Sequence, residues 1–277
     1  MLDTHKEPPA GIEQVLDFSQ EFMEVSRIVS YPMDPDCLVL IDWPPRLLLL
    51  NWRLKKKKAI VSFSEIDKSI EAISDIAFVA RDKALVATNN SKIVLAEFDP
   101  DLDREGGFRV LDQKRCLSCV EDKDQEEQFC EKICCFHSQT KFFVLVKSSE
   151  SEYASIEYGE LNEEKTKMSL VWRVEVSKLF SGKISRLGDL GVLSSQKLVN
   201  KVILVGISEE EYGKKHQVIY INFDWKNRKV VHLGSKKADL TRAERIVTCD
   251  QQDQGQKTSL MIVDSFGKLV SVDLAKE

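Results

Sequence analysis

The strongest constraint on this chain is a set of short β-type runs that recurs along most of its length. Within each run Val, Ile, Leu and Phe alternate with other residues, and Asn, Asp, Gly and Ser separate the runs. Apolar residues at a period of two, bounded by turn residues, are the pattern of β-strands. Few segments have a convincing period of 3.6 residues, so we predict an all-β fold.

The runs fall into groups that begin near Val25, Ile73, Lys132, Lys183 and Glu244. The second run of each group is the most continuously apolar, as expected of a strand buried on both faces between neighbouring sheets. The groups repeat at roughly 50 to 60 residues, within the range of degenerate propeller blades. We therefore predict a β-propeller with about five four-stranded blades, and the main rival is a pair of β-sandwiches.

Three predicted third strands end in related groups: Glu97–Asp99 (EFD), Asn222–Trp225 (NFDW) and Ser271–Asp273 (SVD). In "DSFGKLVSVD" a turn with Gly267 precedes the strand that closes on Asp273. In these features the chain resembles a degenerate WD40-like β-propeller. The chain has no Gly-His dipeptide and no Trp-Asp pair, so the resemblance rests on the periodicity of residues 25–277. It implies a rigid scaffold that binds other proteins.

Residues 1–24 are expected to form a separate N-terminal segment, because the propeller pattern covers 25–277. The fifth group has only three runs, and Gly11–Phe18 is a candidate for its missing outer strand. The apolar residues of Gly11–Met23 also fall near one face of a helix. We favour the strand and a ring that closes within the chain. The helix would leave the ring incomplete, as a piece of a longer protein or a ring completed by a partner.

A cysteine cluster between Arg115 and Gln139 contains a candidate zinc site: Cys116, Cys119, Cys130 and Cys134. A structural zinc ion needs four such ligands in a tetrahedron. On a strand, residues four apart are separated by roughly 13 Å, too far to share an ion, whereas on a helix they lie on one face. We predict a strand at Cys134 and therefore no metal and no cofactor.

A basic run occupies Arg53 and the four lysines Lys55, Lys56, Lys57 and Lys58. Such a run is either a nuclear localisation or phosphate-contacting patch or a solvated hairpin tip. The chain has a net charge of −5, and no aromatic residues alternate with the lysines. We expect a hairpin tip and no nucleic-acid partner. The alternative function is a zinc-bearing or nucleic-acid-contacting module that uses Cys116–His137 and Arg53–Lys58.

The tryptophans fall at predicted strand ends, and Trp43 and Trp225 are candidate contacts for a partner. No export signal, no membrane-spanning run and no catalytic motif is found in the sequence. The cysteines are expected to be reduced thiols of the cytosol or nucleus. These features together predict a non-enzymatic subunit of an intracellular multiprotein complex, cytoplasmic or nuclear, with other protein subunits as partners and no membrane contact.

Overall fold

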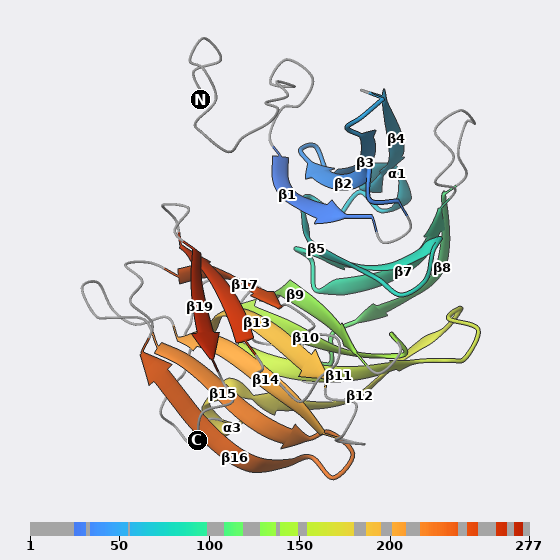
Figure 1. Cartoon of the computed structure of the whole chain (residues 1–277). Helices are drawn as coiled ribbons and strands as arrows, with labels where there is room; N and C mark the ends of the chain where they lie inside the picture. Colours follow the sequence, from blue (N-terminus) through green and yellow to red (C-terminus); the bar gives the residue numbers. More distant parts are fainter. Residues whose placement is uncertain are drawn as a thin grey trace, which may run out of the picture.

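A computed structural model describes most of the chain from Val25 onward. The described residues are 25–31, 34–54, 56–98, 108–118, 128–136, 139–148, 154–179, 187–194, 201–208, 217–237, 243–248, 259–264 and 269–273. They form five separate antiparallel sheets, and each sheet is built from strands that follow one another in the chain. The sheets are arranged as an arc of blades, with blade 1 in blue at one end and blade 5 in red at the other (Figure 1).

Blades 1 and 2 each contain four strands. The strands of blade 1 are β1 Val25–Ser30, β2 Cys37–Asp42, β3 Arg46–Asn51 and β4 Lys56–Ser62. A short helix, α1 Phe63–Ile66, leads to blade 2. The strands of blade 2 are β5 Ile73–Phe78, β6 Lys83–Thr88, β7 Lys92–Phe98 and β8 Phe108–Arg115.

Blades 3 and 4 repeat this arrangement, and three strands of blade 5 are described. Blade 3 contains β9 Gln128–Phe136, β10 Lys141–Ser148, β11 Ala154–Leu161 and β12 Met168–Glu175, followed by α3 Val176–Leu179. Blade 4 contains β13 Leu187–Ser194, β14 Lys201–Ser208, β15 Gln217–Asp224 and β16 Lys229–Lys237. Blade 5 contains β17 Ala243–Thr248, β18 Ser259–Asp264 and β19 Leu269–Asp273.

The first strand of each blade lies at the centre of the arc. Strand β5 packs against β1 and β9, and β13 packs against β9 and β17. Strands β1 and β17 have no comparable contact and lie apart at the two ends of the arc (Figure 1). The described part of the chain therefore forms an open ring.

The core lies between the blades. In β10, Val144 and Val146 pack toward blade 2, whereas Phe143 and Leu145 pack toward blade 4. This alternation explains why the second strands are apolar on both faces, because both faces are covered by another sheet. Blades 1 and 2 share a third apolar cluster, which includes Val39 and Val86.

The structure confirms the predicted all-β propeller and its division into blades. The predicted groups correspond to β1–β4, β5–β8, β9–β12, β13–β16 and β17–β19. The helix considered for the cysteine cluster is wrong from Gln128 onward, since Gln128–Phe136 is strand β9. The two interpretations of Gly11–Met23 fall outside the described residues, as does the whole segment 1–24.

Candidate functional site

The first strands of the five blades share a local feature at the centre of the arc. Each has a β-bulge at, or just before, a charged residue, and an Ile or Leu follows that residue. The five charged residues are Arg27, Asp75, Lys132, Asp189 and Arg245. A bulge redirects the side chains next to it and increases the local twist. The bulges thus place one charged position in each blade at equivalent points of the fold.

Asp75 of blade 2 joins blades 1, 2 and 3. Its Oδ1 forms an ion pair with Nη1 of Arg27, and both side chains are at least nine-tenths buried. Its Oδ2 accepts a hydrogen bond of 2.9 Å from the backbone N–H of Ile133 in blade 3. A buried carboxylate is tolerated when a cation and hydrogen-bond donors compensate for its lost hydration. Asp75 has both kinds of partner, each from a different neighbouring blade.

Asp189 of blade 4 repeats this arrangement. Its Oδ1 lies 3.6 Å from Nζ of Lys132 in blade 3 and accepts a hydrogen bond from the backbone N–H of Leu190. Its Oδ2 accepts a hydrogen bond of 2.7 Å from the backbone N–H of Ile246 in blade 5. In both cases an aspartate contacts a cation of the preceding blade and a backbone N–H of the following blade. The two aspartates together join all five blades.

The apolar residue after each charged position shows where the arc ends. Ile76, Ile133, Leu190 and Ile246 are all buried, with at most 7% of their surface exposed. Ile28 is the equivalent residue of blade 1, and it is 60% exposed. It alternates with Val29, which packs toward blade 2, so Ile28 faces away from blade 2. Blade 1 therefore presents an apolar side chain where every other blade has a neighbour.

The outer face of blade 1, the face directed away from blade 2, is apolar, but its leucines are buried, with at most 5% of their surface exposed. Ile28 lies opposite Leu40, and Leu40 lies opposite Leu48 in the sheet. Leu40, Leu48 and Leu50 form a small apolar cluster that is separate from the cores between the blades. The outer face of blade 1 thus has the composition of a blade–blade interface.

Two further apolar side chains of blade 1 are exposed at its turns. Trp43, in the β2–β3 turn, is 53% exposed, and Leu54, in the β3–β4 turn, is 63% exposed. Val171 and Val231 complete the set of large exposed apolar residues in the described part of the chain. Three of these five residues therefore belong to blade 1, although Trp43 and Leu54 lie at opposite ends of its strands.

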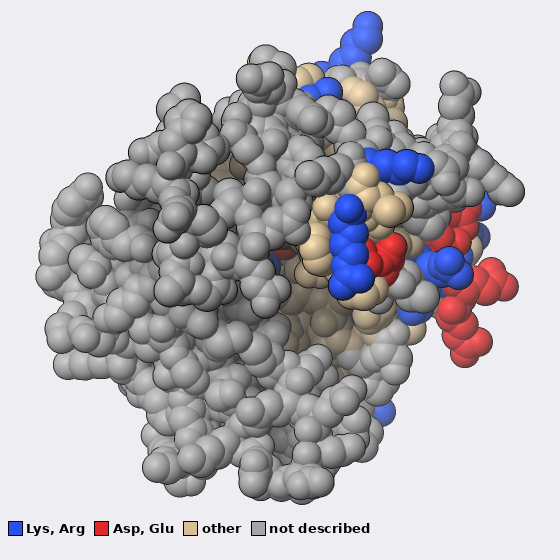
Figure 2. All heavy atoms as spheres, turned by 45° about the horizontal axis from the view of Figure 1, so that its top comes forward, with Lys and Arg blue, Asp and Glu red and all other residues tan. Residues whose placement is uncertain are grey.

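The basic run is divided between a turn and a strand. Arg53 lies in the β3–β4 turn, Lys56 to Lys58 belong to β4, and Lys55 is outside the described residues. The run is thus not confined to a hairpin tip. Arg53 pairs with Asp36 at 3.0 Å and lies over the ring of Trp52. Figure 2 shows acidic side chains beside Lys and Arg on the described surface, so this surface is of mixed charge.

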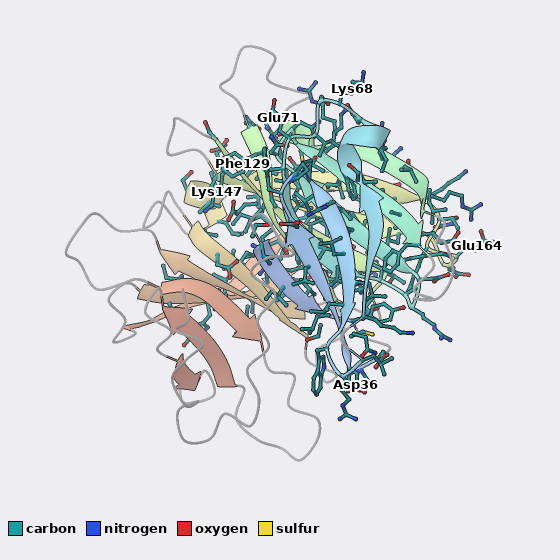
Figure 3. All side chains as sticks on the ribbon, turned by 90° about the horizontal axis from the view of Figure 1, so that it is seen from above. Asp36, Lys68, Glu71, Phe129, Lys147 and Glu164 are labelled. Atoms are coloured by element: carbon teal, nitrogen blue, oxygen red, sulfur yellow. The ribbon has the colours of Figure 1, made fainter. Side chains whose placement is uncertain are left out.

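The side chains near the two ends of the blades lie far apart. Figure 3 shows Lys68 and Glu71, from the connection between blades 1 and 2, on the same side of the view as Phe129 and Lys147 of blade 3. Asp36, the partner of Arg53, lies on the opposite side of the view. The arc therefore has two distinct rims, and Arg53 lies on the rim that carries Asp36.

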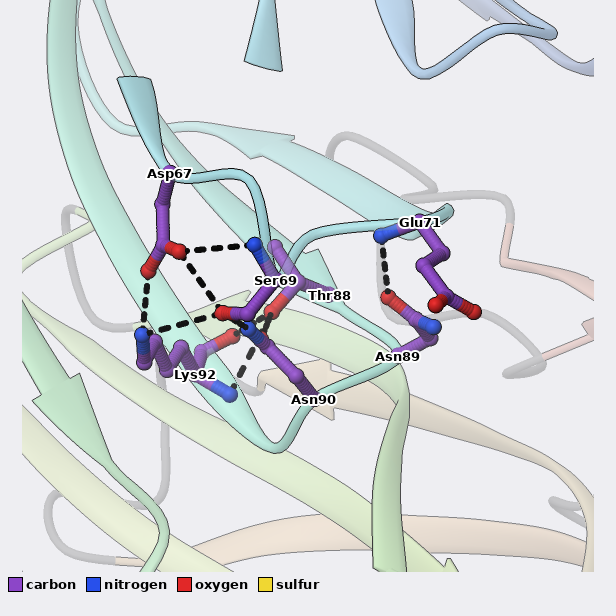
Figure 4. A network of polar contacts seen from close by, with 7 residues as sticks. All are labelled: Asp67, Ser69, Glu71, Thr88, Asn89, Asn90 and Lys92. Carbon is purple, nitrogen blue, oxygen red and sulfur yellow. Dashed lines mark hydrogen bonds and ion pairs between the residues drawn. The ribbon is translucent and has the colours of Figure 1, made fainter. Parts of the chain in front are cut away.

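A polar network stabilises the rim that carries Lys68 and Glu71 (Figure 4). Asp67 pairs with Lys92 and accepts hydrogen bonds from the amide and hydroxyl of Ser69. Asn89 accepts hydrogen bonds from the backbone N–H groups of Glu71 and Ala72. The hydrogen bonds from Lys92 and Ser69 hold the pKa of Asp67 below its ordinary value of 3.8. This network ties the connection from blade 1 to the β6–β7 turn of blade 2.

The cysteines do not form the four-ligand zinc site considered from the sequence. Cys116 and Cys130 are buried with their sulfur atoms 3.1 Å apart, in the core between blades 2 and 3. Cys134 lies on a strand, as predicted, and this strand also contains Cys130. Cys134 packs toward blade 4, and its thiol donates to the carbonyl of Leu190. Cys119 lies outside the described residues. Among the residues described, no cluster of three or more potential ligands could hold a metal ion.

Trp225 is buried, unlike the other candidate tryptophan. It stacks on Tyr158, and Nζ of Lys141 lies 4.5 Å from the centre of its ring. Phe136 and Trp172 belong to the same cluster, which joins blades 3 and 4. Trp225 is thus a core residue, and only Trp43 of this pair is exposed for contact.

The charged position at the blade centres is the feature that the sequence reading missed. Its signal is present in the first strands, which read Ser-Arg-Ile, Ser-Asp-Ile, Glu-Lys-Ile, Gly-Asp-Leu and Glu-Arg-Ile. In each triplet the second residue is charged and the third is Ile or Leu. The sign of the charge at the second position alternates from blade to blade. Alignment of the five first strands on their bulges reveals this pattern.

Comparison with solved structures shows the same class of fold. The chain is similar to the Cps50 (Swd1) β-propeller domain of Myceliophteria thermophila, with a TM-score of 0.56 and 8% identity, over 89% of this chain and 68% of that one. It is also similar to the Nup133 β-propeller domain of Vanderwaltozyma polyspora, with a TM-score of 0.58 and 10% identity, over 89% and 70%. These similarities define the chain as a β-propeller.

No protein-family model matches the chain, and no curated protein matches its sequence. The helices α1 and α3 have four residues each, and no helix in the described part of the chain could cross a membrane.

Proposed function

We propose that this protein is a non-enzymatic interaction scaffold, a β-propeller subunit that binds other proteins chiefly through blade 1. The observation that carries the proposal is the exposure of Ile28, Trp43 and Leu54 on one terminal blade. Burial of a large apolar side chain contributes about 1.5–3 kcal/mol, so each of these residues can stabilise a contact with a partner. Tryptophan and arginine are enriched among the residues that dominate protein interfaces.

The rest of the molecule is suited to a scaffold. Asp75 and Asp189 fix the first strands relative to one another, and apolar cores fill the spaces between successive blades 1 to 4. Loops and terminal surfaces on such a rigid body are where binding residues concentrate. We place the protein in the cytoplasm or nucleus, as a subunit of a larger assembly with protein partners. Residues 25–277 are proposed as one propeller domain.

The test uses the full chain, affinity-tagged and expressed in its native cell. We expect it to elute with partner proteins in a complex larger than the monomer, and mass spectrometry of cross-linked peptides should place blade 1 at the contact. Trp43→Ala and Leu54→Ser should each reduce partner recovery without a change in thermal stability, because both side chains are exposed. Val171→Ser, an exposed apolar change on β12, is the matched control.

Two outcomes would contradict the proposed function. In the first, the full chain elutes as a monomer and cross-links to no other protein. In the second, Trp43→Ala, Leu54→Ser and the control Val171→Ser all recover the same partners in the same amounts.

A further inference from the structure

We propose that Cys116 and Cys130 form a redox-sensitive pair, which peroxide oxidises to a disulfide that ties blade 2 to blade 3. Cys116 directly follows β8 of blade 2, and Cys130 lies on β9 of blade 3. Both cysteines are fully buried, and their sulfur atoms are 3.1 Å apart. The pair belongs to other blades than Ile28, Trp43 and Leu54, so its chemistry does not depend on the proposed binding function.

The distance between the two sulfur atoms is suited to bond formation. The S–S bond of a disulfide is about 2.05 Å long, so the sulfur atoms have to approach each other by only about 1 Å. The two residues are 14 positions apart in the chain. The new bond would therefore close a loop that contains the whole connection between β8 and β9.

The turn between β6 and β7 holds both cysteines in place. The backbone N–H of Cys116 donates a hydrogen bond of 2.9 Å to the carbonyl oxygen of Ser91. The hydroxyl of Ser91 donates to the carbonyl oxygen of Gln128, two residues before Cys130. The thiol of Cys130 itself contacts the carbonyl oxygen of Lys92 at 3.8 Å. One short turn of blade 2 thus positions the backbone near both thiols.

A buried carboxylate fixes the chain immediately after Cys116. Glu157 of β11 is fully buried, and its two oxygens accept hydrogen bonds of 2.7 Å and 2.9 Å from the backbone N–H groups of Leu117 and Ser118. Cys116 is therefore held by blade 2 through Ser91 and by blade 3 through Glu157. Because the two thiols are kept in contact before an oxidant arrives, their reaction with each other is favoured over reaction with a distant thiol.

The other described cysteines are arranged differently. The thiols of Cys37 and Cys134 donate to oxygen acceptors. Cys135 follows Cys134 in β9, and the two side chains pack toward opposite faces of the strand. Among the described cysteines we therefore expect Cys116 and Cys130 to be the pair that forms a disulfide.

The reaction consumes one molecule of hydrogen peroxide. One thiol loses its proton and its sulfur attacks a peroxide oxygen, so that the O–O bond breaks, water departs and a sulfenic acid is left. The sulfur of the second thiol then attacks the oxidised sulfur. The S–S bond forms, the S–O bond breaks and a second water departs. The two thiols together lose two protons and two electrons, and a thiol reductant reverses the change by exchange.

The disulfide is expected to stabilise the contact between blades 2 and 3, because a cross-link restricts the unfolded chain. Disulfides of proteins in reducing compartments are usually transient and often sense the redox state. In the cytoplasm or nucleus, where we place this protein, the pair would thus be reduced at rest and would become a disulfide under peroxide.

The first experiment maps the disulfide in the folded full chain. The reduced protein is treated with hydrogen peroxide, its remaining thiols are alkylated, and it is digested with trypsin without reduction. Trypsin places the two cysteines on separate peptides, 116–123 and 124–132. We expect mass spectrometry to find these two peptides linked, and dithiothreitol to separate them. Peptide 116–123 also contains Cys119, so Cys119→Ser is the matched control and should keep the link, whereas Cys116→Ser should lose it.

Three results would overturn the pair. In the first, the two peptides stay unlinked in the oxidised, folded protein. In the second, Cys119→Ser abolishes the link, which would identify Cys119 as the residue that reacts with Cys130. In the third, peptide 133–141, which carries Cys134 and Cys135, is linked as often as the two expected peptides, which would show unselective oxidation.

A second experiment tests the effect of the disulfide on the fold. Oxidation should raise the melting temperature of the full chain by about 5 °C or more, and dithiothreitol should restore the original value. Cys130→Ser, compared before and after the same treatment, should show no rise and so reports any effect of peroxide on other residues. An equal rise in Cys130→Ser, or a linked protein whose melting temperature is unchanged, would overturn the proposed tie between blades 2 and 3.

Discussion

Asp189 shows how much one side chain contributes to the arrangement of the blades. Its two oxygens hold a cation of blade 3 and backbone N–H groups of blades 4 and 5. The same geometry at Asp75 joins blades 1, 2 and 3. These carboxylates are buried, so they stabilise the fold only while each oxygen keeps its cation or hydrogen-bond donor. Removal of one partner leaves another buried charged or polar group without compensation for its lost hydration.

Asp189→Asn is therefore expected to destabilise the protein. The change leaves Lys132 without its counter-ion and turns an amide N–H₂ toward a backbone donor. The expected cost is near the lower end of the about 3–5 kcal/mol found for broken buried pairs, since Lys132 is partly exposed. Urea unfolding measures it, with Glu163→Gln at an exposed turn as the control. Equal midpoints for the two variants would contradict the role given to Asp189.

Asp67 gives a prediction for the dependence of stability on pH. Hydrogen bonds from Lys92 and Ser69 lower its pKa in the folded state below 3.8, so its contribution to stability is present above the unfolded pKa. That contribution is lost as the pH falls through the folded pKa. Asp67→Asn should thus lower the melting temperature at neutral pH, and the difference from the unchanged protein should shrink below about pH 3.8. A difference that stays constant into acid would show that the pair adds nothing.

At the scale of the strands, the packing of blade 3 depends on one glycine. A Cβ placed on Gly159 of β11 would lie 2.2 Å from the ring of Phe142 on β10, and Phe142 is fully buried. The aromatic ring thus occupies the space that any other residue at 159 would need. Neither strand can move away, because apolar clusters cover both faces of the blade.

Gly159→Ala should therefore destabilise the fold by about 1–3 kcal/mol, the usual cost of overpacking a core. Phe142→Leu removes the ring and should itself be destabilising, because it opens a cavity. In the double variant the two changes should compensate in part, so that the combined loss is smaller than the sum of the single losses. Additive losses, measured by urea unfolding, would mean that the two residues do not compete for the same space.

The strands were predictable from the sequence because each combines a period of two with turn residues at its ends. The centre of the site was not, because Arg27, Asp75 and Lys132 look like the exposed half of an alternating strand. Their meaning depends on contacts with residues more than 40 positions away, such as that of Asp75 with Ile133. Likewise Trp43 and Trp225 both follow a strand, and only the packing of neighbouring blades distinguishes the exposed one from the buried one.

At the scale of the whole molecule, the blades are not equally supported. Blade 3 has an extensive apolar core on each face, with blade 2 on one side and blade 4 on the other. Blade 1 has one such core, shared with blade 2, and its outer face carries the small cluster of Leu40, Leu48 and Leu50. Local stability follows the apolar area that a unit buries, so the end of the arc should open more readily than its middle.

Hydrogen exchange provides the measurement. Amides of β2 and β3 in blade 1 should exchange faster than those of β10 and β11 in blade 3, although all four are inner strands of their sheets. Partner binding to blade 1 should slow the exchange of that blade and leave blade 3 nearly unchanged. Equal protection of the two blades in the isolated protein would show that the arc unfolds as one cooperative unit.

The alternating charges also limit how a propeller of this kind can grow or shrink. A cation on one blade and an acid on the next make a repeating unit of two blades, and the unit after it begins again with a cation. Duplication of one blade, or loss of one interior blade, would bring two like charges together at the centre, whereas a pair of neighbouring blades could be gained or lost with the alternation preserved. Insertions and deletions within the arc are therefore expected to preserve these contacts when they span two blades rather than one.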